Sequence, residues 1–379
     1  MTDHYIGLMS GTSMDGIDAV VASFDDTGMN IVATHERPYA ETLRYALLKA
    51  VATPMDQPLD NIGSLDRQVG ESFRDAALEV LEKSGIAARE IRAIGSHGQT
   101  VRHQPDAVTP YTLQIGNPDI IAAGTGITTV ADFRSADIAV GGQGAPLVPP
   151  FHHWLFGSAD TDRVILNIGG IANITVLKSD GSPVIGFDTG PGNTLLDRWI
   201  RKHRKEPFDR GGDWAATGTC VDGLLEQLMS FGYFDLQPPK STGLEEFNLD
   251  WLQQYPLASY DPADVQATLS ELTAKSVSDA IERYVPETTE LFVCGGGAHN
   301  KDMLSRLRRR LPDTIIDTTE VIGLHPDWVE ASAFAWLAMR TINKQTGNLP
   351  SVTGAISKVV LGTICLLYTS DAADDNRVV

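Results

Sequence analysis

The sequence predicts an α/β protein with two domains of similar topology, each built on a mixed sheet of five strands with flanking helices. Three observations support this. The chain has 379 residues, of which 42% are hydrophobic and 21% charged, which is ordinary globular usage and more chain than the ~150 residues of one typical domain. Each half opens with three short apolar runs separated by turn residues, the pattern of antiparallel strands. In each half, helical periodicity then alternates with further apolar runs.

The first half reads in the order βββ-α-β-α-β. Its helices follow from apolar residues at helical spacing, with Asp60 as the N-cap of the longer one and Gly85 just beyond its end. Asn117 and Pro118 are typical of a helix start. We expect strands at residues 5–9, 17–24, 29–37, 91–96, 112–115 and 127–131, and helices at 43–51, 60–83 and from 118.

The second half repeats this order with little shared sequence. We expect its strands at 164–168, 174–177, 184–187, 291–294 and 314–317, and its helices at 194–203, 221–231, 265–284, 299–311 and 328–341. Residues 1–158 form the first expected domain, which the helix near 328–341 completes, and residues 159–364 form the second. The segment 131–150, rich in Gly and Pro, is expected to connect them or to cover the site as a lid.

The charge balance excludes several classes of partner. With 30 Lys and Arg against 49 Asp and Glu, the net charge is −19, whereas nucleic acids and anionic membranes require clustered positive charge. Cys220, Cys294 and Cys365 are too few and too scattered for a disulfide framework or a metal site. The sequence shows neither a secretion-signal pattern nor an apolar run long enough to span a bilayer. We therefore expect a cytoplasmic protein that binds small molecules, not membranes or nucleic acid.

The turn at residues 10–16, SGTSMDG, is typical of an anion site. Gly11 and Gly16 allow backbone angles forbidden to other residues, so successive amides can converge while Ser and Thr hydroxyls add donors. A phosphate would fit there. The turn has no Lys and the chain has no Walker motif, which excludes a P-loop. The alternative is a tight hairpin that binds nothing.

Two later glycine-rich segments and one acid complete the candidate chemistry. Gly169, Gly170 and Asn173 belong to a second turn that we expect to face the first one. Asp188 follows a strand and precedes a helix with Asn193 at its cap, so it can act as a general base, although an Asx-turn residue is the alternative. One expected strand ends at three consecutive glycines, Gly295, Gly296 and Gly297. Their backbone can approach a flat nucleotide base or ribose, and the alternative is that they only allow close packing of the strand against the next helix.

Polar residues beyond the strand ends suggest substrate contacts. His97, Gln99 and Thr100 lie in one expected loop, where a purely structural role is the alternative. Arg134 is the candidate for a substrate carboxylate because guanidinium binds carboxylate in a fork, the alternative being an interdomain ion pair. Glu330 can bind sugar hydroxyls or merely suit the helix dipole. The loop of Lys240 can meet a phosphate or be solvated.

The motifs GLMSGTSMDGID, GSHGQT, LNIGGIANIT, GFDTGPGN and PPKSTG, in this order and spacing, closely resemble the anhydro-N-acetylmuramic acid kinase family of the sugar kinase/Hsp70/actin superfamily. The resemblance spans residues 5–364. It implies two RNase H-like domains around a central ATP and substrate cleft. It also implies ATP with Mg²⁺, a cytoplasmic homodimer, and a role in peptidoglycan recycling.

The resemblance also implies roles for residues. Asp188 would activate water to attack the anomeric carbon of 1,6-anhydro-N-acetylmuramic acid while the freed 6-oxygen attacks the γ-phosphate, giving N-acetylmuramic acid 6-phosphate and ADP. No residue is assigned as a direct metal ligand, and Asp15 and Asp18 are candidates to hold Mg²⁺ through water. The residues implied to bind ATP are Gly11, Thr12, Ser13, Met14, Asp15, Gly16, Ile17, Asp18, Gly169, Gly170, Asn173, Gly295, Gly296 and Gly297.

Two other functions remain open at this point. One is another sugar or carboxylate kinase of the same superfamily. The other is a nucleotide-switched binding protein of the Hsp70 or actin kind, although no residues remain for a separate peptide-binding domain. The last residues, 365–379, depart from the family pattern, and we expect them to be disordered.

Overall fold

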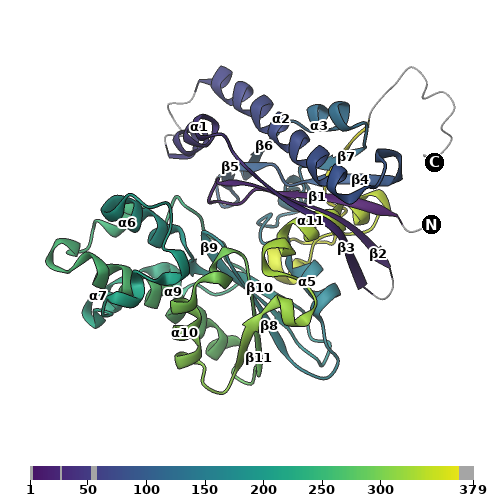
Figure 1. Cartoon of the computed structure of the whole chain (residues 1–379). Helices are drawn as coiled ribbons and strands as arrows, with labels where there is room; N and C mark the ends of the chain where they lie inside the picture. Colours follow the sequence, from purple (N-terminus) through teal and green to yellow (C-terminus); the bar gives the residue numbers. More distant parts are fainter. Residues whose placement is uncertain (1–2, 26–27, 53–57, 367–379) are drawn as a thin grey trace.

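The computed structural model describes residues 3–25, 28–52 and 58–366 and arranges them around two main β-sheets (Figure 1). The first has the strand order β13-β7-β4-β1-β2-β3 and the second β10-β9-β8-β11-β12. Apart from β13, the orders correspond strand for strand. In both, the first three strands are antiparallel neighbours. The fourth lies parallel beside the first, and the fifth lies parallel beside the fourth. The predicted α/β class with two like halves is confirmed.

The first sheet is buried on both faces at its centre. β1 has five consecutive buried residues, and β2 pairs with it in register from His4↔Ser23 to Met9↔Asp18. Helices α1 (Glu41–Ala52), α2 (Leu59–Ser84) and α3 (Pro118–Thr125) belong to this half. The strands of the sheet are β1 (His4–Met9), β2 (Gly16–Asp25), β3 (Gly28–Pro38), β4 (Ile91–Ser96), β7 (Thr129–Ala131) and β13 (Thr363–Cys365).

Three details of the first half differ from the sequence expectation. The expected loop after β4 contains β5 (Gln99–Gln104), which forms a separate two-stranded sheet with β6 (Tyr111–Ile115). Asp60 lies inside α2, whose N-cap position is Pro58, whereas Gly85 ends the helix in the left-handed conformation as expected. β13 adds a sixth strand, so Cys365 lies in the fold and residues 363–365 belong to the first sheet. Residues 367–379 of the expected tail lie outside the described residues.

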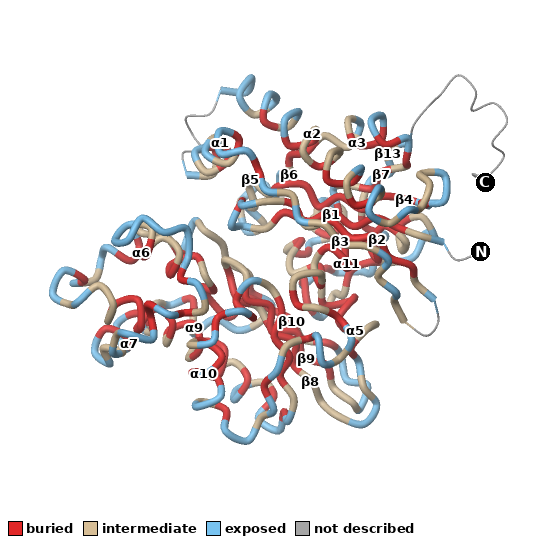
Figure 2. Tube along the Cα trace, in the orientation of Figure 1, coloured by how far each residue is buried: buried red, intermediate tan, exposed pale blue. Residues whose placement is uncertain are grey.

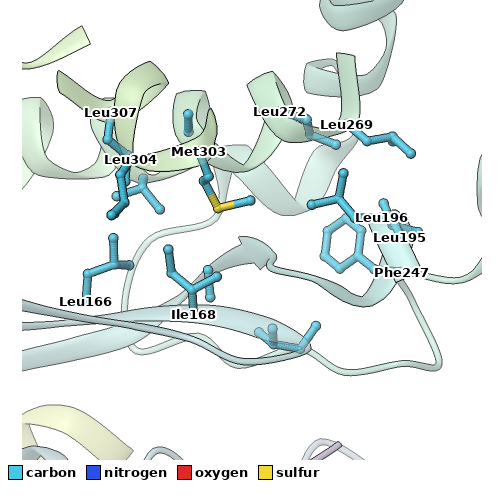
Figure 3. Packing of buried hydrophobic residues seen from close by; sticks show 14 of the residues in the cluster. Leu166, Ile168, Leu195, Leu196, Phe247, Leu269, Leu272, Met303, Leu304 and Leu307 are labelled. Carbon is cyan, nitrogen blue, oxygen red and sulfur yellow. The ribbon is translucent and has the colours of Figure 1, made fainter. Parts of the chain in front are cut away.

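The second sheet is formed by β8 (Arg163–Ile168), β9 (Ile171–Leu177), β10 (Ile185–Pro191), β11 (Glu290–Cys294) and β12 (Ile315–Thr318). Its helices lie along one side of the half in Figure 1. Buried leucines of these helices pack on Leu166 and Ile168 of β8 (Figure 3). The helices of this half are α6 (Thr194–Arg204), α7 (Asp222–Met229), α8 (Leu249–Leu252), α9 (Pro262–Tyr284) and α10 (Lys301–Arg310).

A shared core joins the two halves. Helix α11 (Val329–Ile342) packs on β1, β4 and β2 and also contacts α5 (Pro149–Phe156), which in turn packs on β9. The buried cluster around α11 includes residues of both sheets, such as Val20 and Ile165. Figure 2 shows continuous burial along this junction. Two smaller elements, α4 (Ser135–Ala139) and α12 (Pro350–Thr353), lie in the connecting segments.

Candidate active site

The two glycine-rich turns occupy equivalent positions in the two sheets and meet each other. The first follows β1 and the second, Gly169–Gly170, joins β8 to β9. They approach so closely that a Cβ placed on Gly170 would lie 2.3 Å from Oγ1 of Thr12. Asn173 belongs to β9 and not to the turn. A ligand held by one turn therefore lies beside the other.

The first turn is shaped by side chains, which corrects the role expected of its glycines. Neither Gly11 nor Gly16 has a positive φ; the left-handed residue is Met14, with φ of 51°. Gly16 is needed for a different reason, because a Cβ there would lie 2.7 Å from the Arg37 carbonyl oxygen. The buried side chain of Met14 anchors the turn in the core beneath α2.

Gln99 supports the same turn from β5. Its Nε2 donates to the Gly11 carbonyl oxygen at 3.2 Å, and its Oε1 accepts from the Ser10 hydroxyl at 2.8 Å. Arg44 adds a bond from Nε to the Met14 carbonyl oxygen at 2.9 Å. The Gln99 amide thus bonds inward, to the turn. Thr100, half-buried next to it, accepts from Gln114.

The second turn is fixed by backbone bonds to the start of α6. Gly192 and Thr194 donate amides to the Gly170 carbonyl oxygen at 2.9 and 3.1 Å, and Asn193 donates to that of Gly169 at 2.8 Å. We had expected the Asn193 side chain to cap α6, and this expectation is wrong. Its Nδ2 donates instead to the Ile168 carbonyl oxygen at 3.3 Å. The start of α6 therefore holds the turn, and the turn carries no side chain of its own.

Asp188 lies in β10, only 7% exposed, where the pairing with β9 is interrupted by a bulge between Asp188 and Gly190. The Thr242 amide donates to its Oδ2 at 2.9 Å, and the Tyr233 hydroxyl donates to its backbone carbonyl at 2.7 Å. Burial raises the pKa of Asp188 to about 7, against the lowering effects of the Thr242 amide, Arg134 and Lys240. A carboxyl group with such a pKa can exchange a proton near neutral pH.

Sequence reasoning missed Tyr233 and the contact of the Thr242 amide with Asp188, and the solvated alternative for the Lys240 loop is wrong. The Lys240 ammonium is not solvated: the residue is 8% exposed, donates to the Tyr233 carbonyl at 3.2 Å and lies 4.5 Å from the Tyr233 ring centroid. These residues come from a segment about fifty positions after Asp188. The only sequence signal was the polar PPKSTG motif, which did not indicate that its loop folds back on β10.

Arg134 reaches the site from the first half. His97 Nε2 accepts from its Nε and Nη2 at 3.2 and 2.9 Å, and the Gly144 carbonyl accepts from Nη1 at 2.8 Å. Burial, with the adjacent guanidinium, lowers the pKa of His97 to about 3, so the ring is neutral and can accept. Because guanidinium has five N–H donors, these bonds leave one on each terminal nitrogen. That pair suits a bidentate carboxylate.

Carboxylates gather where α11 begins. Burial and the neighbouring Glu330, Glu36 and Asp15 raise the pKa of Asp18 to about 8. Burial also raises the pKa of Glu330, an effect that Arg134 and Asn167 oppose. Among the residues that the structure describes, no three His, Cys, Asp or Glu side chains are grouped closely enough to form a metal site by themselves. This region would be stabilised by an added cation.

The GGG run after β11 serves packing at two positions and leaves space at one. A Cβ on Gly295 would lie 2.3 Å from Asn167 Oδ1, and one on Gly297 2.3 Å from Ile168 Cγ2. Gly295 also has φ of 75°. A Cβ on Gly296, which is exposed, would have its nearest neighbour, Asn193 Nδ2, at 3.9 Å. Gly296 is therefore the position where the backbone is open to a flat ligand.

Fold and site together define an α/β protein with two like sheets, paired glycine-rich turns between them and a buried carboxyl group at Asp188. A family model described as anhydro-N-acetylmuramic acid kinase matches residues 3–367. The chain belongs to the anhydro-N-acetylmuramic acid kinase family, as the sequence motifs indicated, and it is an enzyme of the kinase class.

Curated relatives agree with this assignment. The anhydro-N-acetylmuramic acid kinase of Coxiella burnetii is 49% identical over 96% of this chain and 97% of its own length. That of Shewanella baltica is 51% identical over 95% and 97%. Among solved structures, the activator of the 2-hydroxyisocaproyl-CoA dehydratase from Clostridium difficile, with bound ADPNP, is 14% identical with a TM-score of 0.47 over 90% of this chain and 96% of that one. That likeness is too distant to add to the assignment.

None of the helices in the described part of the chain is both long enough and apolar enough to cross a membrane.

Proposed function

We propose that this chain uses ATP to open 1,6-anhydro-N-acetylmuramic acid and phosphorylate its 6-oxygen, giving N-acetylmuramic acid 6-phosphate and ADP. The observation that best supports this proposal is the arrangement of Asp188 and Arg134. These residues come from opposite halves, and each affects the other's pKa. This mutual effect supports Asp188 as the proposed base and Arg134 as the proposed carboxylate-binding group of a chain that belongs to this kinase family.

Asp188 is the proposed general base. Its Oδ2 accepts the Thr242 amide, so Oδ1 is the oxygen that takes the proton of the attacking water. The water oxygen bonds to the anomeric carbon, and the bond from that carbon to the bridging 6-oxygen breaks. The 6-oxygen keeps the electron pair and bonds to the γ-phosphorus, whose bond to the β,γ-bridging oxygen breaks to release ADP.

Arg134 is the proposed partner of the lactyl carboxylate. Its remaining N–H pair is held in one orientation because neutral His97 and the Gly144 carbonyl occupy the other donors. Glu330 is proposed to accept from sugar hydroxyls, and Gln99 to act through the first turn. Thr100 stays a candidate for a further sugar contact. Such fixed groups reduce the entropy that must be lost at the transition state.

The two turns are the proposed phosphate site, formed by residues 11–18 and by Gly169 and Gly170, with Asn173 behind them in β9. Asp15 and Asp18 would hold Mg²⁺ through water, since Mg²⁺ takes few protein ligands and keeps water and phosphate oxygens. When bound, Mg²⁺ would neutralise charge that develops on the phosphates. Gly296 would face the adenosine, with Gly295 and Gly297 shaping the strand–helix turn beneath it.

We also propose that the enzyme is a cytoplasmic homodimer that acts in peptidoglycan recycling, as its family resemblance implies. Residues 1–158 with α11 and β13 would form one domain, and β8 through β12 the other. Nucleotide and sugar would bind between them. The proposal that the domains close on ligand follows from this arrangement.

The test is a product analysis in ¹⁸O-labelled water. Purified enzyme, 1,6-anhydro-N-acetylmuramic acid, ATP and Mg²⁺ should yield a sugar phosphate carrying one ¹⁸O at the anomeric position when the reaction is quenched rapidly for mass spectrometry. The phosphoryl oxygens should stay unlabelled. 1,6-Anhydro-N-acetylglucosamine, which lacks the lactyl carboxylate, is the matched control and should react more slowly. Label in free phosphate with no sugar phosphate would instead indicate an ATPase.

A further inference from the structure

A pocket of about 300 Å³ lies toward the C-terminal end of α11. Arg340 in its lining is ten residues beyond Glu330 on α11, or roughly 15 Å along the helix axis. Two tryptophans line it, Trp154 of α5 and Trp336 of α11, with ring centroids 6.1 Å apart and planes inclined at 33°. Pro150 and Leu349 add apolar surface. None of these residues takes part in the proposed reaction.

The ionisable groups of this aromatic pocket, the cavity lined by Trp154 and Trp336, are all basic. Arg340, Lys358 and His153 line it, and no Asp or Glu is among the described residues that do so. Arg340 lies over the Trp336 ring at 5.2 Å, and its Nε and Nη2 donate to the Thr346 carbonyl at 3.1 and 2.9 Å. Within the described chain, neither Arg340 nor Lys358 forms an ion pair. In a chain of net charge −19, such a group of cations favours an anion.

The walls of the pocket are already fixed. Asn348 donates from Nδ2 to Asp137 Oδ1 at 2.8 Å and to the Ser357 carbonyl at 3.1 Å, while its Oδ1 accepts the Val359 amide at 2.7 Å. Trp336 is 4% exposed, and its indole N–H has no partner in the described structure.

We propose that the aromatic pocket binds a small organic anion with a planar apolar body. The planar body would pack on Trp154 and Leu349, and the anionic group would lie beside Arg340 and Lys358. Preformed pockets that are mainly apolar, with a few convergent polar groups, are typical small-molecule sites. The volume of about 300 Å³ admits a two-ring aromatic carboxylate.

The test compares two naphthalene probes, one anionic and one uncharged. Calorimetric titration of the full chain with 2-naphthoate should show saturable binding, and uncharged 2-naphthol should bind more weakly. Lys358 is exposed, so Lys358→Glu should leave the fold intact while weakening 2-naphthoate binding about tenfold through charge reversal. Lys301→Glu, an equally exposed substitution on α10, should leave the affinity unchanged. Naphthoate should also raise the melting temperature of wild type more than that of Lys358→Glu.

Three results would overturn the proposal. Equal affinity for naphthoate and naphthol would show that the cations play no part. Equal loss in the Lys358 and Lys301 variants would place the probe elsewhere, for example in the active site. A dimer that dissociates as naphthoate binds, and that Lys358→Glu fails to form in sedimentation velocity, would assign the pocket to a second copy of the chain.

Discussion

The two glycine-rich turns occupy the same position in like sheets, yet they are held in place differently. The first is a long turn held by side chains: Gln99 and Arg44 bond to its carbonyls, and Met14 is buried beneath it. The second has two glycines, fixed by backbone bonds from residues 192–194 and by the closeness of Thr12. A side-chain support can be removed at a cost in stability, whereas in the second turn an atom added at Gly170 would meet Thr12 of the first turn.

The largest effect is expected from the half that carries the base. Asp188→Asn keeps an oxygen for the Thr242 amide but removes the proton acceptor, so kcat should fall by about 10²- to 10⁴-fold. ATP affinity, measured by calorimetry, should change little. Turnover close to that of the wild type would exclude Asp188 as the base and leave both halves with binding roles only.

The pH dependence sharpens the same contrast, because only the ionised form of Asp188 can accept a proton. With its pKa raised to about 7 by burial, kcat/KM should rise with pH and level off above that value. Below it, the rate should fall by about tenfold per pH unit. A profile that is flat from pH 5 to pH 8 would contradict this assignment.

Adding one carbon to the second turn should be costly. Gly170→Ala places a Cβ 2.3 Å from Thr12 Oγ1, so the Thr12 side chain or one of the turns must move, and the KM for ATP should rise about tenfold. Gly169→Ala is the matched control, since its nearest contact would be 3.6 Å away.

The double variant Thr12→Ala/Gly170→Ala separates contact from flexibility. Removing Oγ1 should restore part of the ATP affinity, which a double-mutant cycle would measure as coupling. Additive effects of the two changes would mean that the turns do not touch in solution.

The smallest effect is expected from the side-chain support of the first turn. Gln99→Leu leaves the Ser10 hydroxyl and the Gly11 carbonyl without this partner, and should lower the free energy of unfolding by about 1–3 kcal/mol in urea titration. Gln68 is exposed on α2, so Gln68→Leu should change the free energy of unfolding by no more than about 0.5 kcal/mol. An equal loss of stability in both variants would show that Gln99 gives the first turn no specific support.

The fold was largely predictable because its strands are apolar runs and its helices keep strict periodicity. The failures occurred where tertiary pairing decides. β5 contains Gln99, Arg102 and His103, which are more typical of a loop, and it becomes a strand through pairing with β6. β13 is three residues long and exists because β7 offers an edge.

The candidate site was predictable where a motif lies on one turn and unpredictable where distant segments meet. Glycine spacing indicated both turns, and the end of a strand indicated Asp188. The Thr242 amide that holds Asp188 lies 54 residues away, and no periodicity reports such a contact. Likewise, Gly16 was identified correctly as important but for the wrong reason, since only the structure shows the close Arg37 carbonyl.

The position of α11 and β13 has a consequence for biosynthesis. Helix α11 packs on the first sheet and β13 is one of its strands, yet both are translated last. Strands β1, β2 and β4 therefore leave the ribosome long before the helix that covers them. Residues 163–318 of the second sheet emerge together. We expect maturation to begin in the middle of the chain. Limited proteolysis of a chain truncated after residue 320 and released from the ribosome should then cut the first half and spare the second.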